Sequence, residues 1–431
     1  MKLELSGGWT VADYGDEVIR QTSGPLRIVL GDRAASLVVD NRSNTTREEI
    51  RVAFYPLALW FASSWWRLRW EPENADLISH TTSWRMAHEM AAAGLGYTWP
   101  RMSFRSDGET IEVTSIPSDP SALQPVRYLL GTNEILVSSD FERIVDNFVD
   151  FVVARLDDVG VHNTDLHRLW SDVLSERRDK QASEFRRVEA QLGFDPDDAP
   201  VGLVDTFIGV STSIGKDAMS EVASACAGYD PGRKLSEIHE ASKVGGISAE
   251  LAFDPKSIVS DKVKEFMPWE RGYKLASSAR DALGISSGPI SDELLGDLFK
   301  VSASIFKDDS CALNSSQLSL AVRDKETSYF KLLFHRKVYE SRRFEAARFL
   351  ADCISASESD YWYPVTDFRT ARQKLQRAFA AELLCPIADL REFLDGDYSD
   401  ERLNEAGAHF LVSPLIVELQ RDNRLLHFGQ S

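Results

Sequence analysis

The chain has 431 residues, of which 43% are hydrophobic and 27% are charged. These proportions are typical of a globular protein and argue against wholesale disorder, and a chain of this length is expected to divide into two or three domains. The formal net charge of −18 opposes binding to nucleic acid or to an anionic membrane, because the average surface would repel both. The opening residues do not resemble a leader and there is no long apolar run, so we expect a cytoplasmic protein without a membrane span.

Residues 1–138 have the composition of a mixed, β-rich region. Short runs of Val, Ile and Leu alternate with Gly, Asn and Asp, which is typical of strands joined by turns. We predict strands at 26–30, 36–39 and 109–113. The role of this region cannot be read from its sequence.

One segment of this region, residues 54–70, is rich in aromatic side chains. It contains Trp60, Trp65, Trp66 and Trp70. The segment is too short, and too basic at its end, to span a membrane. Two interpretations remain open, a buried helix of the core, which we prefer, and an exposed aromatic interface for a partner.

The pattern changes to a helical period near residue 139. Phe141, Ile144, Val145 and Phe148 recur at intervals of three and four behind capping residues that begin at Ser138, as the buried face of a helix requires. We predict further helices at 165–192, 236–245 and 269–283. Because Gly and Pro interrupt the pattern repeatedly, we interpret residues 139–312 as a helical domain built as a bundle.

The last part of the chain, residues 313–431, returns to a mixed pattern. We predict strands at 318–322 and 329–334, and helices that begin near 342, 371 and 399. A small sheet with helices packed against it fits this order. The chain as a whole is therefore predicted to be α+β, with a β-rich domain (1–138), a helical domain (139–312) and a small α+β domain (313–431).

Three segments of the last domain carry a family resemblance. Residues 343–347 read Arg-Phe-Glu-Ala-Ala, residues 379–384 read Phe-Ala-Ala-Glu-Leu-Leu before Pro386, and residues 410–413 read Phe-Leu-Val-Ser. In this order they resemble landmarks of the ImmA/IrrE family of bacterial metallopeptidase-like proteins. The resemblance covers roughly residues 315–431 and implies a zincin-like fold for that domain.

The zinc motif of that family is lost in this chain. In the family, two histidines of a His-Glu-x-x-His helix bind zinc and the glutamate is the general base. Here Arg348 and Asp352 take the histidine positions, Phe349 takes the glutamate position, and Gln373 lies near the third ligand position. A guanidinium has no lone pair for a metal, and Phe cannot transfer a proton. We therefore predict a pseudopeptidase with no metal site and no cofactor.

The degenerate positions define a candidate cleft formed by Arg348, Phe349, Asp352, Gln373 and Glu382. One hypothesis is that Arg348 and Asp352, four residues apart and opposite in charge, form an ion pair in the former metal site. The other hypothesis is that Arg348 lines a cleft that still binds an anion or a peptide. Glu382 is expected to support its helix or the cleft wall.

The preferred function is an inactive, peptidase-like regulatory protein that binds a protein partner, whose identity is not readable. Relatives of the family serve bacterial stress responses, mobile elements and phage defence, so the resemblance implies a similar role. One alternative is a DNA-binding regulator, since the final helices outline a helix-turn-helix with Arg421 and Arg424. Another is an enzyme with an unrecognised non-zinc site, for which the candidates are His88, Glu89, Arg101 and Asp107.

Overall fold

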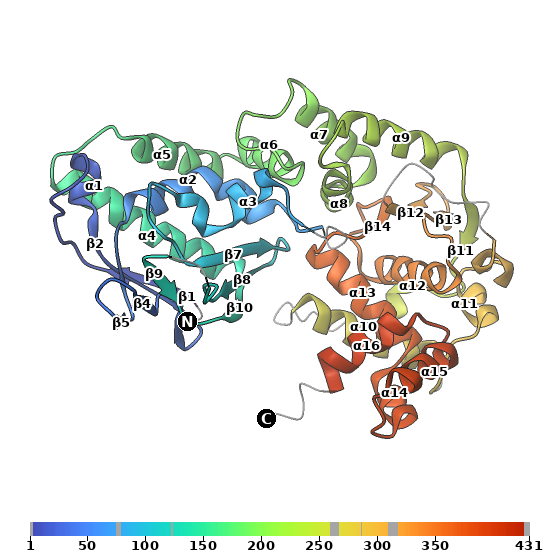
Figure 1. Cartoon of the computed structure of the whole chain (residues 1–431). Coiled ribbons are helices and arrows are strands. Elements are labelled where there is room, and N and C mark those ends of the chain that lie inside the picture. The colour runs from blue at the N-terminus through green and yellow to red at the C-terminus, as the bar shows by residue number, and fades with distance from the viewer. Residues whose placement is uncertain are drawn as a thin grey trace. The chain divides into compact units, whose positions relative to one another are not determined.

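The computed structural model describes residues 3–74, 79–121, 124–258, 267–285, 287–308 and 318–425 (Figure 1). The fold is mixed α+β, with about 52% helix and 18% strand, and its sheets are small and antiparallel. The chain divides into two compact units, Met1–Asp205 and Thr206–Ser431. The segment 139–312, predicted to be one helical domain, contributes helices to both units.

The described residues of the first unit form three small sheets. Their strands are β1 (Leu3–Gly7), β2 (Ser23–Leu30), β3 (Arg33–Ala34), β4 (Val38–Asp40), β5 (Thr45–Arg47), β6 (Ile50–Ala53), β7 (Arg101–Ser106), β8 (Thr110–Ile116), β9 (Val126–Tyr128) and β10 (Thr132–Val137). Strand β2 pairs with β1, β3 and β6, β8 lies between β7 and β10, and β4 lies between β5 and β9. The strands predicted at 26–30 and 109–113 are thus confirmed in β2 and β8, whereas only the end of 36–39 is strand.

The first unit has one central helix, α2, and several helices around it or nearby. They are α1 (Glu17–Gln21), α2 (Tyr55–Trp70), α3 (Thr82–His88), the 3-10 turn η1 (Met90–Ala93), α4 (Ser138–Asp158), α5 (Asp165–Arg178) and α6 (Lys180–Gln191). A helix that is apolar on all sides needs cover on all sides. Helix α2 obtains this cover from α3, α4, α5, α6 and β7, as can be followed in Figure 1.

The aromatic residues of α2 belong to the core. Trp60, Trp65 and Trp66 are 5%, 2% and 2% exposed. Trp70 is half-buried, and the guanidinium carbons of Arg69 and Arg187 lie 4.1 and 4.4 Å from its ring centre. The buried-helix interpretation is therefore confirmed, and these four side chains do not form an exposed aromatic patch.

Helix α4 follows the predicted period but starts differently from the prediction. Its first residue is Ser138, directly after β10, and its N-cap is Val137, which makes no capping hydrogen bond through its side chain. The predicted caps at 138–140 are therefore wrong, because the strand runs straight into the helix. The buried positions Phe141, Ile144 and Phe148 face the unit's interior as expected, where α4 packs against β1, β8 and β10.

The second unit is built on one four-stranded antiparallel sheet. Its strands are β11 (Ile247–Glu250), β12 (Leu318–Arg323), β13 (Tyr329–Leu333) and β14 (Trp362–Thr366), in the order β11-β13-β12-β14. The strands predicted at 318–322 and 329–334 are confirmed. Its helices are α7 (Leu203–Ile214, which begins at the end of the first unit), α8 (Lys216–Cys226), α9 (Pro231–Val244), α10 (Pro268–Ala282), α11 (Asp292–Leu298), α12 (Tyr339–Ser355), α13 (Ala371–Leu384), α14 (Ile387–Leu394), α15 (Asp400–Phe410) and α16 (Pro414–Gln420), followed by a π-helical turn (Arg421–Leu425) and accompanied by the 3-10 turns η2 (Pro255–Ser257) and η3 (Ala303–Phe306).

Three helices carry the core of the second unit. Helix α12 packs against β12 and β14, and α13 packs against both α12 and α10. Helices α10 and α13 approach closely at Gly272, because a Cβ atom there would lie only 2.4 Å from the carbonyl oxygen of Leu375. The absence of a side chain at Gly272 therefore lets α10 pack directly on α13.

None of the helices in the described ranges combines the length and the apolar character that crossing a bilayer requires.

Candidate functional site

The positions that resemble the degenerate zinc motif lie on α12 and α13. Helix α12 carries Arg348, Phe349 and Asp352, and α13 begins behind Thr370, whose side chain accepts a hydrogen bond from the backbone N–H of Gln373 at 3.1 Å. This cap places Gln373 in the first turn of α13, next to the end of β14. Two helices and one strand thus bring Arg348, Asp352 and Gln373 together, whereas Phe349 and Glu382 lie outside this group.

Arg348 is buried, and its side chain joins α12 to β14 and α13. Its Nη2 donates to the carbonyl oxygen of Thr366 at 2.7 Å and to Oε1 of Gln373. Arg348 as a whole is only 5% exposed. Burial lowers the pKa of Arg348 to about 10, although Asp367 and Glu345 oppose this change. The guanidinium therefore stays charged near neutral pH. One of its nitrogens donates hydrogen bonds to two oxygens of the protein.

Gln373 holds the end of β14 through its amide. Its Oε1 also accepts from the backbone N–H of Thr366 at 2.9 Å, and its Nε2 donates to the carbonyl oxygen of Pro364 at 2.9 Å. Gln373 is fully buried, so these bonds replace the water that its amide loses. The donor and the acceptor of the amide are both needed, and a carboxylate could supply only the acceptor.

Asp352 pairs with a residue that the sequence argument did not single out. Arg372 Nη2 donates to Asp352 at 2.8 Å, and Arg372 Nη1 donates to Asp360 at 2.8 Å. The predicted ion pair between Arg348 and Asp352 is therefore wrong. Both side chains do point from one face of α12, but α13 inserts Arg372 beside Asp352, and one guanidinium can bridge two carboxylates.

The electrostatics of this bridge follow from its burial. Asp352 and Asp360 are each 1% exposed. Burial opposes the charge of Arg372, yet Asp352 and Asp360 hold the pKa of its guanidinium above the usual range. Burial raises the pKa of Asp360, and Arg372 only partly offsets this. The bridge is thus a desolvated charge network in which each member depends on the others.

Glu221 extends the network to α8. The hydroxyl of Thr370 donates to Oε2 of Glu221 at 2.9 Å. Glu221 is 5% exposed, and burial raises the pKa of its carboxyl despite the attraction of Arg372. We call Glu221, Arg348, Asp352, Asp360, Thr370, Arg372 and Gln373 the polar core. Glu221 was missed because α8 lies far away in the sequence and its pattern carries no sign of this contact.

The two remaining predicted residues lie outside the polar core. Phe349 is fully buried among apolar side chains, 5.6 Å from Phe334 between ring centres. Glu382 accepts a hydrogen bond from Nη1 of Arg424 and one from the backbone N–H of Ile387 at 3.3 Å. The expectation that Glu382 supports its helix agrees with these contacts, since it ties the end of α13 to α14 and to the C-terminal turn.

The polar core has the wrong donor set for a zinc site. Zinc is held by imidazole, thiolate or carboxylate groups in tetrahedral arrangement, whereas Arg348 is a cation and Gln373 is a neutral amide engaged with backbone groups. Within the described ranges, no three His, Cys, Asp or Glu side chains are grouped so that they could hold a metal ion. The chemistry of these side chains suits a structural cross-link between α12, α13 and β14.

No family model, curated protein or solved structure matches the chain. The interpretation of both units therefore rests on their own residues.

The first-unit candidates for an enzyme site are used in separate structural contacts. His88 is fully buried, and its two ring nitrogens lie 3.0 Å from the carbonyl oxygen of Phe104 and 2.9 Å from Oε2 of Glu71. Glu89 pairs with Arg85 at 3.1 Å on the surface of α3.

Asp107 stabilises the turn between β7 and β8. Its carboxylate accepts bonds from the backbone N–H groups of Glu109 and Thr110 at 2.9 and 2.6 Å. Arg101, at the other end of β7, is exposed. His88, Glu89 and Asp107 therefore serve separate local contacts, and Arg101 is exposed, so these contacts do not define one reacting position.

The C-terminal arginines are also engaged. Arg421 pairs with Asp422 at 2.7 Å, and Arg424 binds Glu382 and lies 4.0 Å from the ring centre of Tyr273. The adjoining helix α16 exposes Leu415 and other apolar residues. Among the described residues, Arg421 and Arg424 are thus paired with acidic side chains and do not form the exposed basic stripe that the DNA-binding alternative requires.

Proposed function

We propose that the protein is a peptidase-like regulatory protein that binds a protein partner without hydrolysing it, and that residues 313–431 form a degenerate zincin-like domain of the ImmA/IrrE kind. The observation that carries the proposal is the bonding of Arg348. A cation stands where the resemblance expects the first metal ligand, and it is tied to Gln373 and Thr366.

The energetics of the polar core support a structural role. Removing one partner from a buried ion pair costs about 3–5 kcal/mol, because the other charge is left without compensation. Asp352 and Asp360 both depend on Arg372 in this way. A side-chain network that must remain intact for folding is poorly suited to open for a metal or a substrate.

The family resemblance supports the biological setting. Members of the ImmA/IrrE family act in bacterial stress responses, in mobile elements and in phage defence, and we propose a cytoplasmic role of this type. The first unit, which has no counterpart in the resemblance, then supplies the recognition of the partner.

The metal content of the purified chain tests the proposal. The protein is prepared without chelators, dialysed against zinc and then against buffer, and analysed for metal by mass spectrometry. We expect far less than one zinc per chain, and the same trace amount in the Asp352→Asn variant. One zinc per wild-type chain that is lost in Asp352→Asn would overturn the proposal, as would peptide hydrolysis that depends on Asp352.

The partner is tested by affinity capture from the native bacterium. We expect one protein, such as the product of a neighbouring gene, to be recovered intact and in a fixed ratio to the chain. Recovery of that protein in cleaved form would contradict a non-hydrolytic role.

A further inference from the structure

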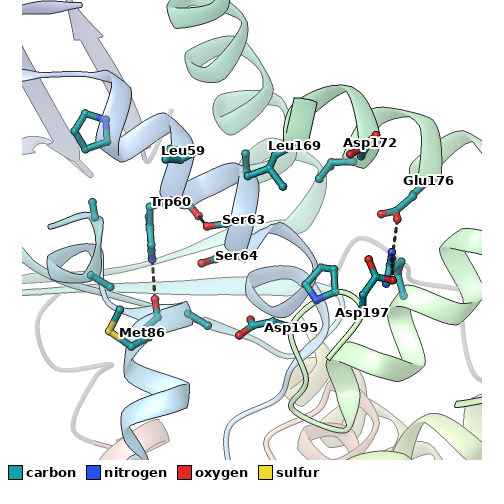
Figure 2. Close-up of a pocket in the computed structure, with 18 of the residues that line it drawn as sticks. Leu59, Trp60, Ser63, Ser64, Met86, Leu169, Asp172, Glu176, Asp195 and Asp197 are labelled. Carbon is teal, nitrogen blue, oxygen red and sulfur yellow. Dashed lines mark hydrogen bonds and ion pairs between the residues drawn. The ribbon is translucent and has the colours of Figure 1, made fainter. Parts of the chain in front are cut away.

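The first unit contains a cavity of about 890 Å³ between α2, α3, α5 and the loop after α6 (Figure 2). This volume falls within the range of about 300–1,000 Å³ that is usual for ligand pockets. The cavity lies within one compact unit, so its walls are formed by elements that pack directly against α2.

One end of the cavity is apolar. Figure 2 shows Leu59 and Trp60 of α2 and Met86 of α3 there. The indole N–H of Trp60 donates to the carbonyl oxygen of Met86 at 2.8 Å, which fixes the orientation of the ring. Met86, Leu95 and Leu169 line the cavity although they are 56%, 65% and 37% exposed. Large apolar side chains that gather at an open cavity are typical of a binding surface.

The other end of the cavity is acidic. Its lining includes Asp172, Glu176, Asp195 and Asp197, against one lining cation, Arg186, and against Arg67, which pairs with Asp195 at 3.2 Å. In Figure 2 these carboxylates come from α5 and from the loop after α6. The lining therefore has an excess of negative charge at this end.

The acidic end is held in place before any ligand arrives. Arg186 binds Glu176 at 2.7 Å and Asp197 at 2.9 Å, and the indole N–H of Trp66 donates to Glu176 at 2.8 Å. Asp172 is exposed and makes no hydrogen bond or ion pair with another described residue. One carboxylate at this end is therefore available to a ligand without losing an existing partner.

We propose that this cavity is the docking site for a partner segment in which apolar side chains are followed by Lys or Arg. The apolar side chains would cover Met86 and Leu169, which are exposed, and the cation would meet Asp172. Burial of apolar area supplies affinity, and charge complementarity selects against acidic segments. The inference rests on the proposed function, since it names the chemistry of the partner.

The same features argue against other occupants. A phosphate or nucleic-acid ligand would meet the carboxylates rather than a basic surface. A second copy of this chain carries a net charge of −18 and would also be repelled at the acidic end. A basic, partly apolar peptide is the occupant that both ends of the cavity accept.

The experiment measures binding of fluorescein-labelled, end-capped heptapeptides to the full-length chain by fluorescence anisotropy. Three peptide compositions are compared: two leucines followed by two lysines, two leucines followed by two glutamates, and two serines followed by two lysines. We expect only the first to bind, more weakly as salt is raised from about 0.05 to 0.3 M, because salt screens exposed charges. Equal binding of the leucine–glutamate peptide would overturn the proposal, as would no binding of the leucine–lysine peptide.

Two surface variants and two matched controls locate the site. Asp172→Asn and Leu169→Ser are each expected to weaken binding about twofold to fivefold, the effect of removing one exposed contact. Asp158→Asn removes an exposed charge and Val201→Ser an exposed apolar side chain away from the cavity, and both should leave binding unchanged. Thermal unfolding confirms that all four variants fold, and equal effects of variants and controls would overturn the assignment.

Sedimentation of the chain alone tests whether a second copy of the chain occupies the cavity. A wild-type dimer that Leu169→Ser dissociates would overturn the proposal in favour of self-association. Failure of the docking proposal can be distinguished from failure of the proposed function. Stoichiometric zinc would overturn the regulatory proposal without affecting peptide binding, whereas a lack of peptide binding would overturn only the proposed docking site.

Discussion

Arg372 offers the sharpest test of how the second unit is held together. The Arg372→Leu variant keeps an aliphatic side chain at this position but removes the only guanidinium that contacts both Asp352 and Asp360 in the described structure. Both carboxylates remain buried, each 1% exposed. The perturbation therefore leaves two uncompensated charges in the interior rather than deleting a pair.

The expected cost is large. Breaking a buried pair by removing one partner costs about 3–5 kcal/mol. For a unit of this size, 1 kcal/mol shifts the melting temperature by roughly 2–4 °C, so we expect the second unit to melt roughly 6–20 °C earlier. Differential scanning calorimetry is the suitable measurement, because two compact units need not unfold in one transition.

The cost is also expected to depend on pH. Burial already raises the pKa of Asp360, and without Arg372 the largest influence that offsets this rise is lost. The contribution of Asp360 to stability is then present below its unfolded pKa of about 4 and lost as the pH rises through its folded value. The gap between Arg372→Leu and wild type should therefore be widest at neutral pH and should shrink towards pH 4.

A matched control is available on the surface. Arg233 pairs with Glu237 at 2.8 Å on α9, with the two side chains 71% and 32% exposed. Arg233→Leu is expected to cost no more than about 0.5 kcal/mol. The reasoning is refuted if Arg372→Leu costs less than about 1 kcal/mol at pH 7, or if its cost does not change between pH 7 and pH 4.

Two further predictions concern the same unit. Burial raises the pKa of Glu345 from 4.5 to about 7, so its contribution to stability is present below pH 4.5 and lost as the pH rises through 7. Relative to wild type, Glu345→Gln should therefore gain about 3 kcal/mol in unfolding free energy between pH 4 and pH 8, measured by urea denaturation; a constant difference would contradict this. Gly272→Ala would place a Cβ 2.4 Å from the carbonyl oxygen of Leu375 and should cost about 1–3 kcal/mol. Gly209→Ala, in α7 with open space around it, should be neutral or stabilise by up to about 1 kcal/mol; equal effects of the two substitutions in thermal melts would show that helix crowding is not the cause.

Elements whose pattern is local could be predicted from the sequence. Helix α4 was predicted because Phe141, Ile144 and Phe148 repeat with the helical period, and helix α15 starts at Asp400, next to the predicted start near residue 399. Helix α2 has no polar face, so periodicity could not distinguish a core helix from an interface. Its burial became clear only from the helices that surround it.

The partners within the polar core could not be predicted in the same way. Arg348 and Asp352 share a helical face, which made a mutual pair the simplest expectation. The observed partners depend on tertiary packing, since Arg372 comes from α13, Asp360 from the residues before β14 and Glu221 from α8. The cavity is equally non-local, because its walls come from elements separated by more than a hundred residues along the chain.

The unequal distribution of tryptophan gives the two units different optical signals. Of the ten tryptophans, only Trp269 and Trp362 belong to the second unit. Intrinsic emission therefore reports mainly on the first unit, whereas far-ultraviolet circular dichroism responds to the helices of both. A denaturation followed by both signals resolves the order in which the units unfold, without a label or a truncated chain. A substitution that weakens only the polar core should move the dichroism transition and leave most of the emission transition in place.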